Sequence, residues 1–245
     1  MSDFPIQAAF LFPIIAFLYS MAGFAGGSSY LAVLMGSGLP HGEAKTFALC
    51  CNILVSSVVF LNFAKAGHFR FKLSLPLVLF SVPLAFLGAK VHLPKETAAL
   101  LVGLSLFAAT SRLFVMISSA TPRELSSKTL WIFAPLLGSA IGFISGVIGI
   151  GGGIFLSPLL ILLGWASVKE ASASAALFIL LNSLSGFISK SPDISFIHGP
   201  FALTAMAVVV TGWAGSRLGA GRLSESAVSR VLAGILAWVG LGLLF

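Results

Sequence analysis

The stretch GVIGIGGGIFLSPLL, residues 146–160, places five glycines and a proline inside an otherwise apolar run. Glycine weakens a helix interior by about 1 kcal/mol relative to alanine, and proline removes a backbone hydrogen-bond donor. In hydrocarbon, an irregular backbone survives only where protein or a water-filled cavity covers it. The stretch therefore predicts a covered break in a membrane helix, with the next helix beginning near Ile154.

This predicted break is a candidate anion site. Beyond Gly151, it frees the backbone N–H groups of Gly152, Gly153 and Ile154 from a regular helix. Helix N-termini bind anions through such unpaired N–H groups and through the positive end of the helix dipole. Ser157 follows within one helical turn and adds a hydroxyl group to the candidate site.

The first half of the chain carries a weaker copy of this stretch, MAGFAGGSSYLAVLM at residues 21–35. At an offset of 125 residues, Gly26 and Gly27 align with Gly151 and Gly152. Two Gly-interrupted segments at matching places in two halves are the best sequence pointer to the binding site of a transporter. The alignment predicts two homologous repeats in one integral membrane domain. The repeats cover about 5–118 and 129–245, and a linker at about 119–128 joins them.

The composition excludes a soluble domain. The chain of 245 residues is 58% apolar and only 9% charged, whereas about a quarter of the residues of a soluble domain are charged. Long apolar stretches recur along the whole length, which predicts an all-α polytopic protein of the inner (cytoplasmic) membrane. The net charge of +7 comes from basic residues scattered between the apolar stretches, so no nucleic-acid partner is expected.

The apolar segments give about eight to ten transmembrane passes. The second and seventh are short, and their 12 or 13 helical residues rise only about 18–20 Å against a hydrocarbon core of about 30 Å. These two either cross with extended ends or re-enter without crossing. The expected segments are 5–24, 28–39, 44–64, 73–91, 97–118, 129–149, 153–165, 169–189, 198–216 and 225–245.

The distribution of Lys and Arg favours ten crossings. If all ten segments cross, these residues divide 4 against 10 between the two faces; if the short segments re-enter, they divide 7 against 7. The positive-inside rule prefers the first arrangement, with both termini outside the cytoplasm. Five passes per repeat is an odd number, so the two repeats are predicted to be inverted. Eight passes with two re-entrant hairpins stays open as an alternative.

The carboxylates argue for an anionic substrate. All seven Asp and Glu residues fall in expected loops or helix ends, whereas a cation carrier usually keeps Asp or Glu within the membrane. Four of the glutamates stand in the first turn of an expected helix, where a capping role is the simplest interpretation. These four are Glu43, Glu96, Glu170 and Glu225.

Hydroxyl and amide side chains follow each break and are candidates to complete an anion-binding shell. The first half offers Ser28, Ser29 and Asn52, and the second offers Ser157 and Asn182. Small and polar residues also hold membrane helices together, so a packing role is the alternative for each of them. The chain shows no Ser–His–Asp arrangement and no phosphate-binding loop, and the histidines and cysteines have no ligand spacing. Neither an enzyme, a metal site nor a cofactor is therefore expected.

The sequence GIGGGIFLSPLL at 149–160 resembles the Gly-Gly-Gly…Pro-Leu signature of the TauE/SafE family of membrane transporters, the sulfite exporters. The two-repeat layout and the chain length are similar to that family over essentially the whole chain. The resemblance implies transport of sulfite, thiosulfate or a sulfonate. The first break departs from the pattern, because two glycines and two serines stand where the family usually has three glycines, and Val33 stands in place of Pro158.

These observations lead to one hypothesis, a secondary transporter of a small sulfur-containing anion that works by alternating access. The breaks at 26–29 and 151–154 would meet near the midplane, and any proton coupling would use protonation of the substrate or groups near the loops. On this hypothesis Gly152→Leu abolishes transport. The alternatives are a carrier of another small organic anion and a non-transporting membrane scaffold or assembly protein. A homo-oligomer is compatible with the sequence.

Overall fold

The computed structural model describes residues 6–91, 126–149, 151–190 and 199–244, and these ranges contain helices and no strand. The segment expected at 97–118 lies outside them. The observed helix ends agree with the expected ones to within a few residues, apart from a π-helix that the sequence did not suggest. The helices are α1 (Ile6–Met21), α2 (Gly27–Gly36), α3 (His41–Lys65), α4 (Phe71–Lys90), α6 (Ser127–Ile148), α7 (Gly153–Leu162), α8 (Val168–Lys190), α9 (Pro200–Arg217), the π-helix η1 (Leu218–Arg222) and α10 (Glu225–Leu244).

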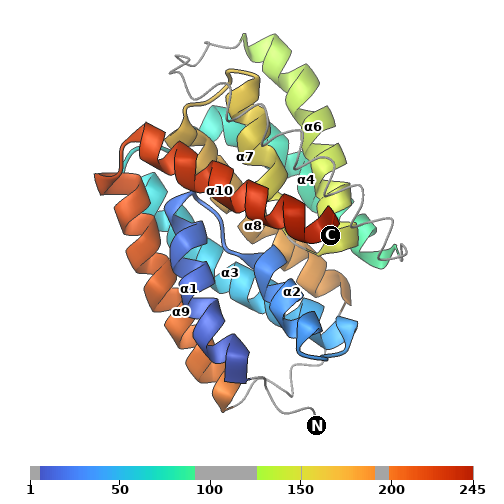
Figure 1. The fold of residues 1–245 in the computed structure, drawn as a ribbon. Coiled ribbons are helices and arrows are strands. Elements are labelled where there is room, and N and C mark those ends of the chain that lie inside the picture. Colours follow the sequence, from blue (N-terminus) through green and yellow to red (C-terminus); the bar gives the residue numbers. More distant parts are fainter. Residues whose placement is uncertain (1–5, 92–125, 150, 191–198, 245) are drawn as a thin grey trace.

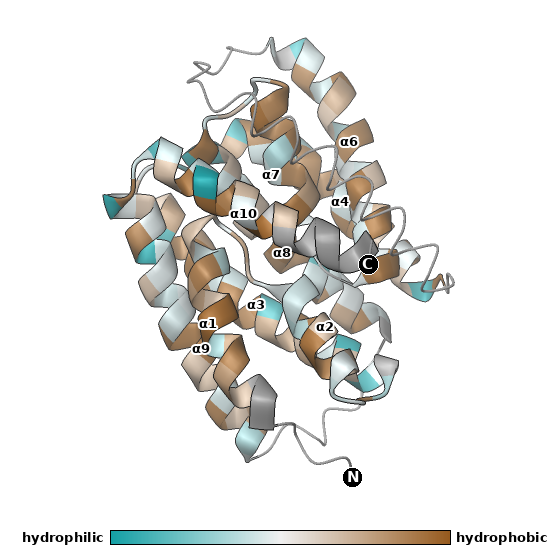
Figure 2. Cartoon of the chain, viewed as in Figure 1, coloured by the Kyte–Doolittle hydropathy of each residue, from teal (hydrophilic) through white to brown (hydrophobic). Residues whose placement is uncertain are grey.

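Five of the described helices, α3, α4, α6, α8 and α9, are long and apolar enough to cross a membrane. Brown, hydrophobic residues recur along several of these helices in Figure 2. Large apolar side chains on the outer helices are exposed, such as Ile132 and Leu136 on α6 and Leu203 on α9. Such faces suit hydrocarbon rather than water, so the chain is an all-α polytopic membrane protein, as the sequence predicted.

The helices form two flanks around a central pair (Figure 1). Helix α1 packs along α9 on one flank, α6 packs along α4 on the other, and α3 packs against α8 between them. Burial agrees with this arrangement, because 67% of the α8 span is buried inside the protein but only 33% of the α6 and α9 spans. Each of these pairs combines one helix from the first half of the chain with one from the second, so neither half buries its apolar faces alone.

Helices α1, α3 and α9 run in the same direction. The contacts that fix this direction are Phe17 with Gly215 and Met21 with Gly219 for α1 and α9, and Phe47 with Phe201 and Asn62 with Ser216 for α3 and α9. Because α1 and α3 are parallel, the chain returns through the bundle between them. The return segment is 22–40, which contains the first break and α2.

Helices α4, α6 and α8 are parallel in the same way. The contacts are Leu77 with Gly138 and Ala85 with Gly146 for α4 and α6, and Ser74 with Ser174 and Ser81 with Asn182 for α4 and α8. The second break and α7 therefore also return through the bundle, within residues 149–167. These two returns favour crossing over re-entry for the short segments.

The two sets of helices run in opposite directions. At the start of α3, Lys45 Nζ donates to the carbonyl oxygens of Gly146 and Val147 at the end of α6, at 3.2 and 3.1 Å. At the start of α8, Ser172 Oγ donates to the Ala22 carbonyl just beyond α1, at 2.8 Å. Corresponding helices of the two halves thus point in opposite directions within the bundle. How the halves are oriented across a bilayer stays a prediction.

Candidate functional site

Each break is a pair of backbone turns at glycine followed by a helix of ten residues. Gly26 is the N-cap of α2 with φ 97°, and Gly152 is the N-cap of α7 with φ 74°. Glycine adopts this left-handed conformation without the steric penalty of other residues. Neither N-cap supplies a side-chain hydrogen bond, so the first N–H groups of both helices lack a cap. The structural equivalent of Gly26 is Gly152, one residue later than the sequence alignment placed it.

Asn52 joins the two breaks. It lies about halfway along α3, is fully buried, and its side-chain amide rests against Gly27 so closely that no Cβ would fit there. A Cβ on Gly151 would also lie 3.3 Å from Asn52 Nδ2. Among the described residues, neither Asn52 Nδ2 nor Oδ1 has a hydrogen-bond partner. Leaving a buried polar group unpaired costs about 1–3 kcal/mol, which points to a partner other than the protein.

A small cavity of about 10 Å³ lies beside Asn52. Its lining takes residues from the first turns of both α2 and α7. A cavity of this size has room for about one water molecule, so a larger oxyanion enters only if apolar side chains of its wall move. The lining residues are Tyr19, Phe24, Ala25, Gly26, Gly27, Ser28, Asn52, Ile154 and Ile179.

Three polar residues of the second half, Ser157, Asn182 and Ser183, differ in how close they lie to the second break. Ser183 Oγ faces Gly151, and it has no hydrogen-bond partner among the described residues. The same holds for buried Ser157 Oγ and for Asn182 Nδ2, whereas Asn182 Oδ1 accepts a hydrogen bond of 3.0 Å from Ser81. The structure thus brings Ser183 to the Asn52 side of the break and ties Asn182 to α4.

Gly152 and Gly153 are closely packed. A Cβ on Gly152 would lie 2.8 Å from Ser145 Cβ and 3.0 Å from Phe178, and one on Gly153 would lie 2.5 Å from Ile179. A leucine at position 152 would therefore be strained and would clash whether or not the break binds an anion. The loss of transport expected for Gly152→Leu stays a prediction, but it would not by itself report on anion binding, and Asn52 offers a more specific variant.

Two tyrosines beside the first break were not anticipated from the sequence. Tyr19 Oη lies 2.6 Å from Ser29 Oγ, which therefore points to Tyr19, and Tyr19 also lines the cavity. Tyr30 packs against Gly26, and its hydroxyl has no hydrogen-bond partner among the described residues. The chain contains only two tyrosines, and both stand within a few residues of the first glycine pair, a signal that could have been noticed.

Lys45 was not singled out from the sequence, and it is only 4% exposed. It stands in the second turn of α3, which begins at His41, and faces the end of α6. Its side chain covers Gly149, and its ammonium group reaches the last carbonyls of α6. A cation at a helix C-terminus is stabilised by the helix dipole, and this one lies next to the second break.

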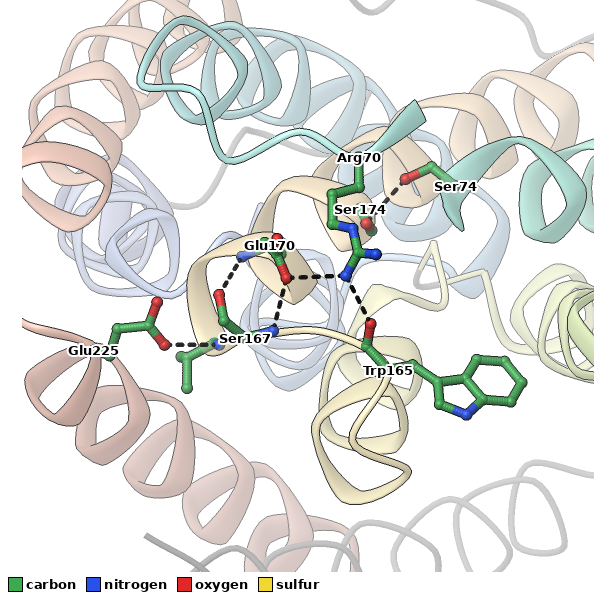
Figure 3. Close-up of polar contacts among 8 residues, drawn as sticks. Arg70, Ser74, Trp165, Ser167, Glu170, Ser174 and Glu225 are labelled. Atoms are coloured by element: carbon green, nitrogen blue, oxygen red, sulfur yellow. Dashed lines mark hydrogen bonds and ion pairs between the residues drawn. The ribbon is translucent and has the colours of Figure 1, made fainter. Parts of the chain in front are cut away.

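The N-terminus of α8 holds a group of polar contacts away from the breaks (Figure 3). Glu170 Oε2 accepts from the Ser167 N–H at 2.9 Å, which is the capping role expected for Glu170. Arg70 from the first half pairs with the same carboxylate at 3.4 Å and donates to the Trp165 carbonyl at 3.2 Å. Glu225 stands in the first turn of its own helix α10, as expected, and its Oε2 also accepts from the Val168 N–H of α8 at 3.0 Å.

Comparison with known proteins gives a consistent result. Residues 8–243 match the model of the family described as Sulfite exporter TauE/SafE. The chain is 30% identical over 245 residues to a probable membrane transporter protein, y4hK, of Sinorhizobium fredii, with 98% of each chain covered. It is 28% identical over 110 residues to a probable membrane transporter protein, YunE, of Bacillus subtilis, with 43% of this chain and 38% of that one covered. No solved structure matches the chain.

Proposed function

This chain belongs to the TauE/SafE family of sulfite exporters, and we propose that it moves a small sulfur-containing oxyanion across the cytoplasmic membrane by alternating access. Its family and its relatives make it a membrane transporter and not an enzyme. The identity of the anion as sulfite, thiosulfate or a sulfonate, and the cycle that carries it, are the proposal.

The convergence of two uncapped helix N-termini on the unpaired amide of Asn52 carries this proposal. Backbone N–H groups of α2 and α7 offer positive partial charge without a fixed cation. Asn52 Nδ2 adds a donor between the two breaks, and the hydroxyls of Ser28 and Ser183 border the same region. A set made largely of donors suits an oxyanion, because every oxygen of sulfite or a sulfonate accepts hydrogen bonds.

The helix directions support alternating access. The second break packs against core helices of both halves, because Gly151 lies beside Asn52 of α3 and Ser183 of α8. A relative rotation of the halves would open the Asn52 region first to one end of the bundle and then to the other. No described carboxylate lines the cavity, so proton coupling, if present, would use the protonation of the substrate itself.

The test is anion flux into proteoliposomes that contain the full-length protein. Sulfite, thiosulfate, sulfate and a small sulfonate are compared, with and without a pH gradient. We expect uptake of one sulfur anion by the wild type and its loss in Asn52→Leu, which keeps the number of side-chain heavy atoms and removes the amide. The matched control is Ser57→Ala, because Ser57 lies on the same helix and, within the described part of the chain, bonds to the Ile53 carbonyl of its own turn at 2.6 Å.

The outcomes separate the alternatives. Flux that survives in Asn52→Leu overturns the proposed site. If the protein moves a carboxylate or another organic anion and none of the four sulfur anions, the proposed substrate is wrong. If Asn52→Leu also abolishes that flux, the proposed site remains supported. A flux that a pH gradient accelerates would add proton coupling.

A further inference from the structure

We propose that a second polar cavity, formed where α3, α9 and η1 end, binds the phosphate group of an anionic phospholipid. This cavity has a volume of about 350 Å³, far larger than the one beside Asn52. Its lining residues are Asn62, Lys65, Ala66, Trp213, Arg217, Ala220 and Gly221. Two of these are cations that come from different helices, and neither forms an ion pair with a described carboxylate.

The position of the two cations points to lipid. On α9 the exposed apolar side chains recur at Leu203, Met206, Val210 and Trp213, and Arg217 continues this stripe by one more turn. On α3 exposed Leu61 is followed one turn later by Lys65, the last residue of that span. The faces that meet the acyl chains therefore end at the two cations, at the level where lipid headgroups lie.

The shape of the cavity depends on the π-helix. Residues Leu218–Arg222 leave the α-helical path, and Gly221 has no heavy atom within 4 Å of where a Cβ would be. The Ala220 carbonyl accepts from Lys169 Nζ at 3.2 Å and lies 2.9 Å from His68 Nε2, which holds this irregular turn in place. Single π-turns inside helices are frequent at functional sites.

The walls leave both cations available for a phosphate. Asn62 Nδ2 donates to Ser216 Oγ at 2.8 Å and fixes α3 against α9, so the distance between the two cationic stems is set by packing. The Arg217 guanidinium lies 5.1 Å from the centre of the Trp213 ring, which orients it while its N–H donors remain able to bind oxygen. Arginine and lysine together are the usual partners of phosphate.

Among the described residues, most of the positive charge stands at the end of the bundle that holds the cavity. Lys65, Arg70, Lys72, Lys128 and Arg217 all stand at this end by the helix directions given above. The positive-inside rule assigns this end to the cytoplasm, whose leaflet is the one enriched in anionic lipid. The complementary charge favours a phospholipid such as phosphatidylglycerol over a neutral one.

The experiment is native mass spectrometry of the full-length protein in detergent micelles doped with phosphatidylglycerol or phosphatidylcholine. We expect the wild type to retain phosphatidylglycerol selectively. The double variant Lys65→Gln, Arg217→Gln should lower that retention by roughly 30-fold. Each cation near an anionic headgroup strengthens binding by about five-fold, and the two factors multiply. The matched control is Lys128→Gln, an exposed lysine at the same end of the bundle that does not line the cavity.

Equal retention by the double variant and the wild type would overturn the site, as would an equal loss in Lys128→Gln. In a second experiment, inorganic phosphate is added to the protein that carries bound lipid. If phosphate displaces the lipid at a similar concentration, the ligand is free phosphate and the lipid assignment fails. Arg217→Lys, which keeps the charge, should retain the lipid and shows that a loss in the glutamine variants is not misfolding. Anion flux plays no part in these readouts, so they stand apart from the test of transport.

Discussion

At the scale of single residues, Asn52 occupies a buried position that the stability of the fold does not explain. It is fully buried, touches both breaks, and leaves its amide without a partner among the described residues. A buried polar group that the fold does not satisfy lowers stability, so its presence needs another reason. Binding of a substrate that supplies the missing hydrogen bonds is that reason in the proposed function.

The stability of Asn52→Leu is a prediction at this scale. Leucine has the same number of side-chain heavy atoms, fills the space beside Gly27 and removes the unpaired polar atoms. The free energy of unfolding should stay the same or rise by roughly 1 kcal/mol. Thermal unfolding of the purified protein in detergent measures this. A drop of several degrees in Tm would mean that the fold itself uses the amide, and the loss of flux would then say nothing about substrate.

At the scale of secondary structure, the glycines have two different roles. Gly26 and Gly152 adopt positive φ and set the breaks. Gly138, Gly142 and Gly146 instead form one face of α6, where the backbone of α4 comes too close for any side chain. Small residues at intervals of four allow this approach in membrane helices. Gly146, which opens the stretch quoted at the start, therefore serves helix packing and not the break.

Gly142→Val tests this helix contact. A Cβ at position 142 would lie 2.6 Å from Ser81 Cα and 2.8 Å from Ser81 Cβ, so α4 and α6 must separate. Such overpacking costs about 1–3 kcal/mol, and Tm should fall accordingly. Gly234→Ala on α10 is the matched control, because nothing lies within 4 Å of its added Cβ. That variant should gain up to about 1 kcal/mol through helix propensity. Equal Tm values for the two variants would contradict the packing role.

At the scale of the whole molecule, the helix directions determine how the halves relate. Corresponding helices point in opposite directions, and each short helix carries the chain back through the bundle. The contacts at the α8 N-terminus tie the halves together at one end, since Arg70 of the first half pairs with Glu170 of the second at 3.4 Å. A cycle in which the halves rotate must rearrange contacts of this kind.

Labelling of single cysteines tests the orientation in the membrane. In a background with Cys50 and Cys51 replaced by alanine, Lys72→Cys and Lys128→Cys should react with an impermeant reagent only from the cytoplasmic side. Lys90→Cys, at the other end of the bundle, should react only from the opposite side. The reason is the excess of Lys and Arg at the first end. Labelling of Lys72→Cys and Lys90→Cys from the same side would contradict the helix arrangement.

The sequence by itself determined that the protein is all-α, that it lies in a membrane, and where its helices break. These properties are local: apolar length decides the spans, and the conformational freedom of glycine decides the two turns at Gly26 and Gly152. Only the tertiary structure decided that Asn52 lies between both breaks, that Gly152 packs on Ser145, and that Lys45 is buried. The positions of Asn52 and Lys45 depend on segments from the other half of the chain, and the contact of Gly152 with Ser145 depends on how the chain turns back onto α6. No local pattern records which residue will become such a neighbour.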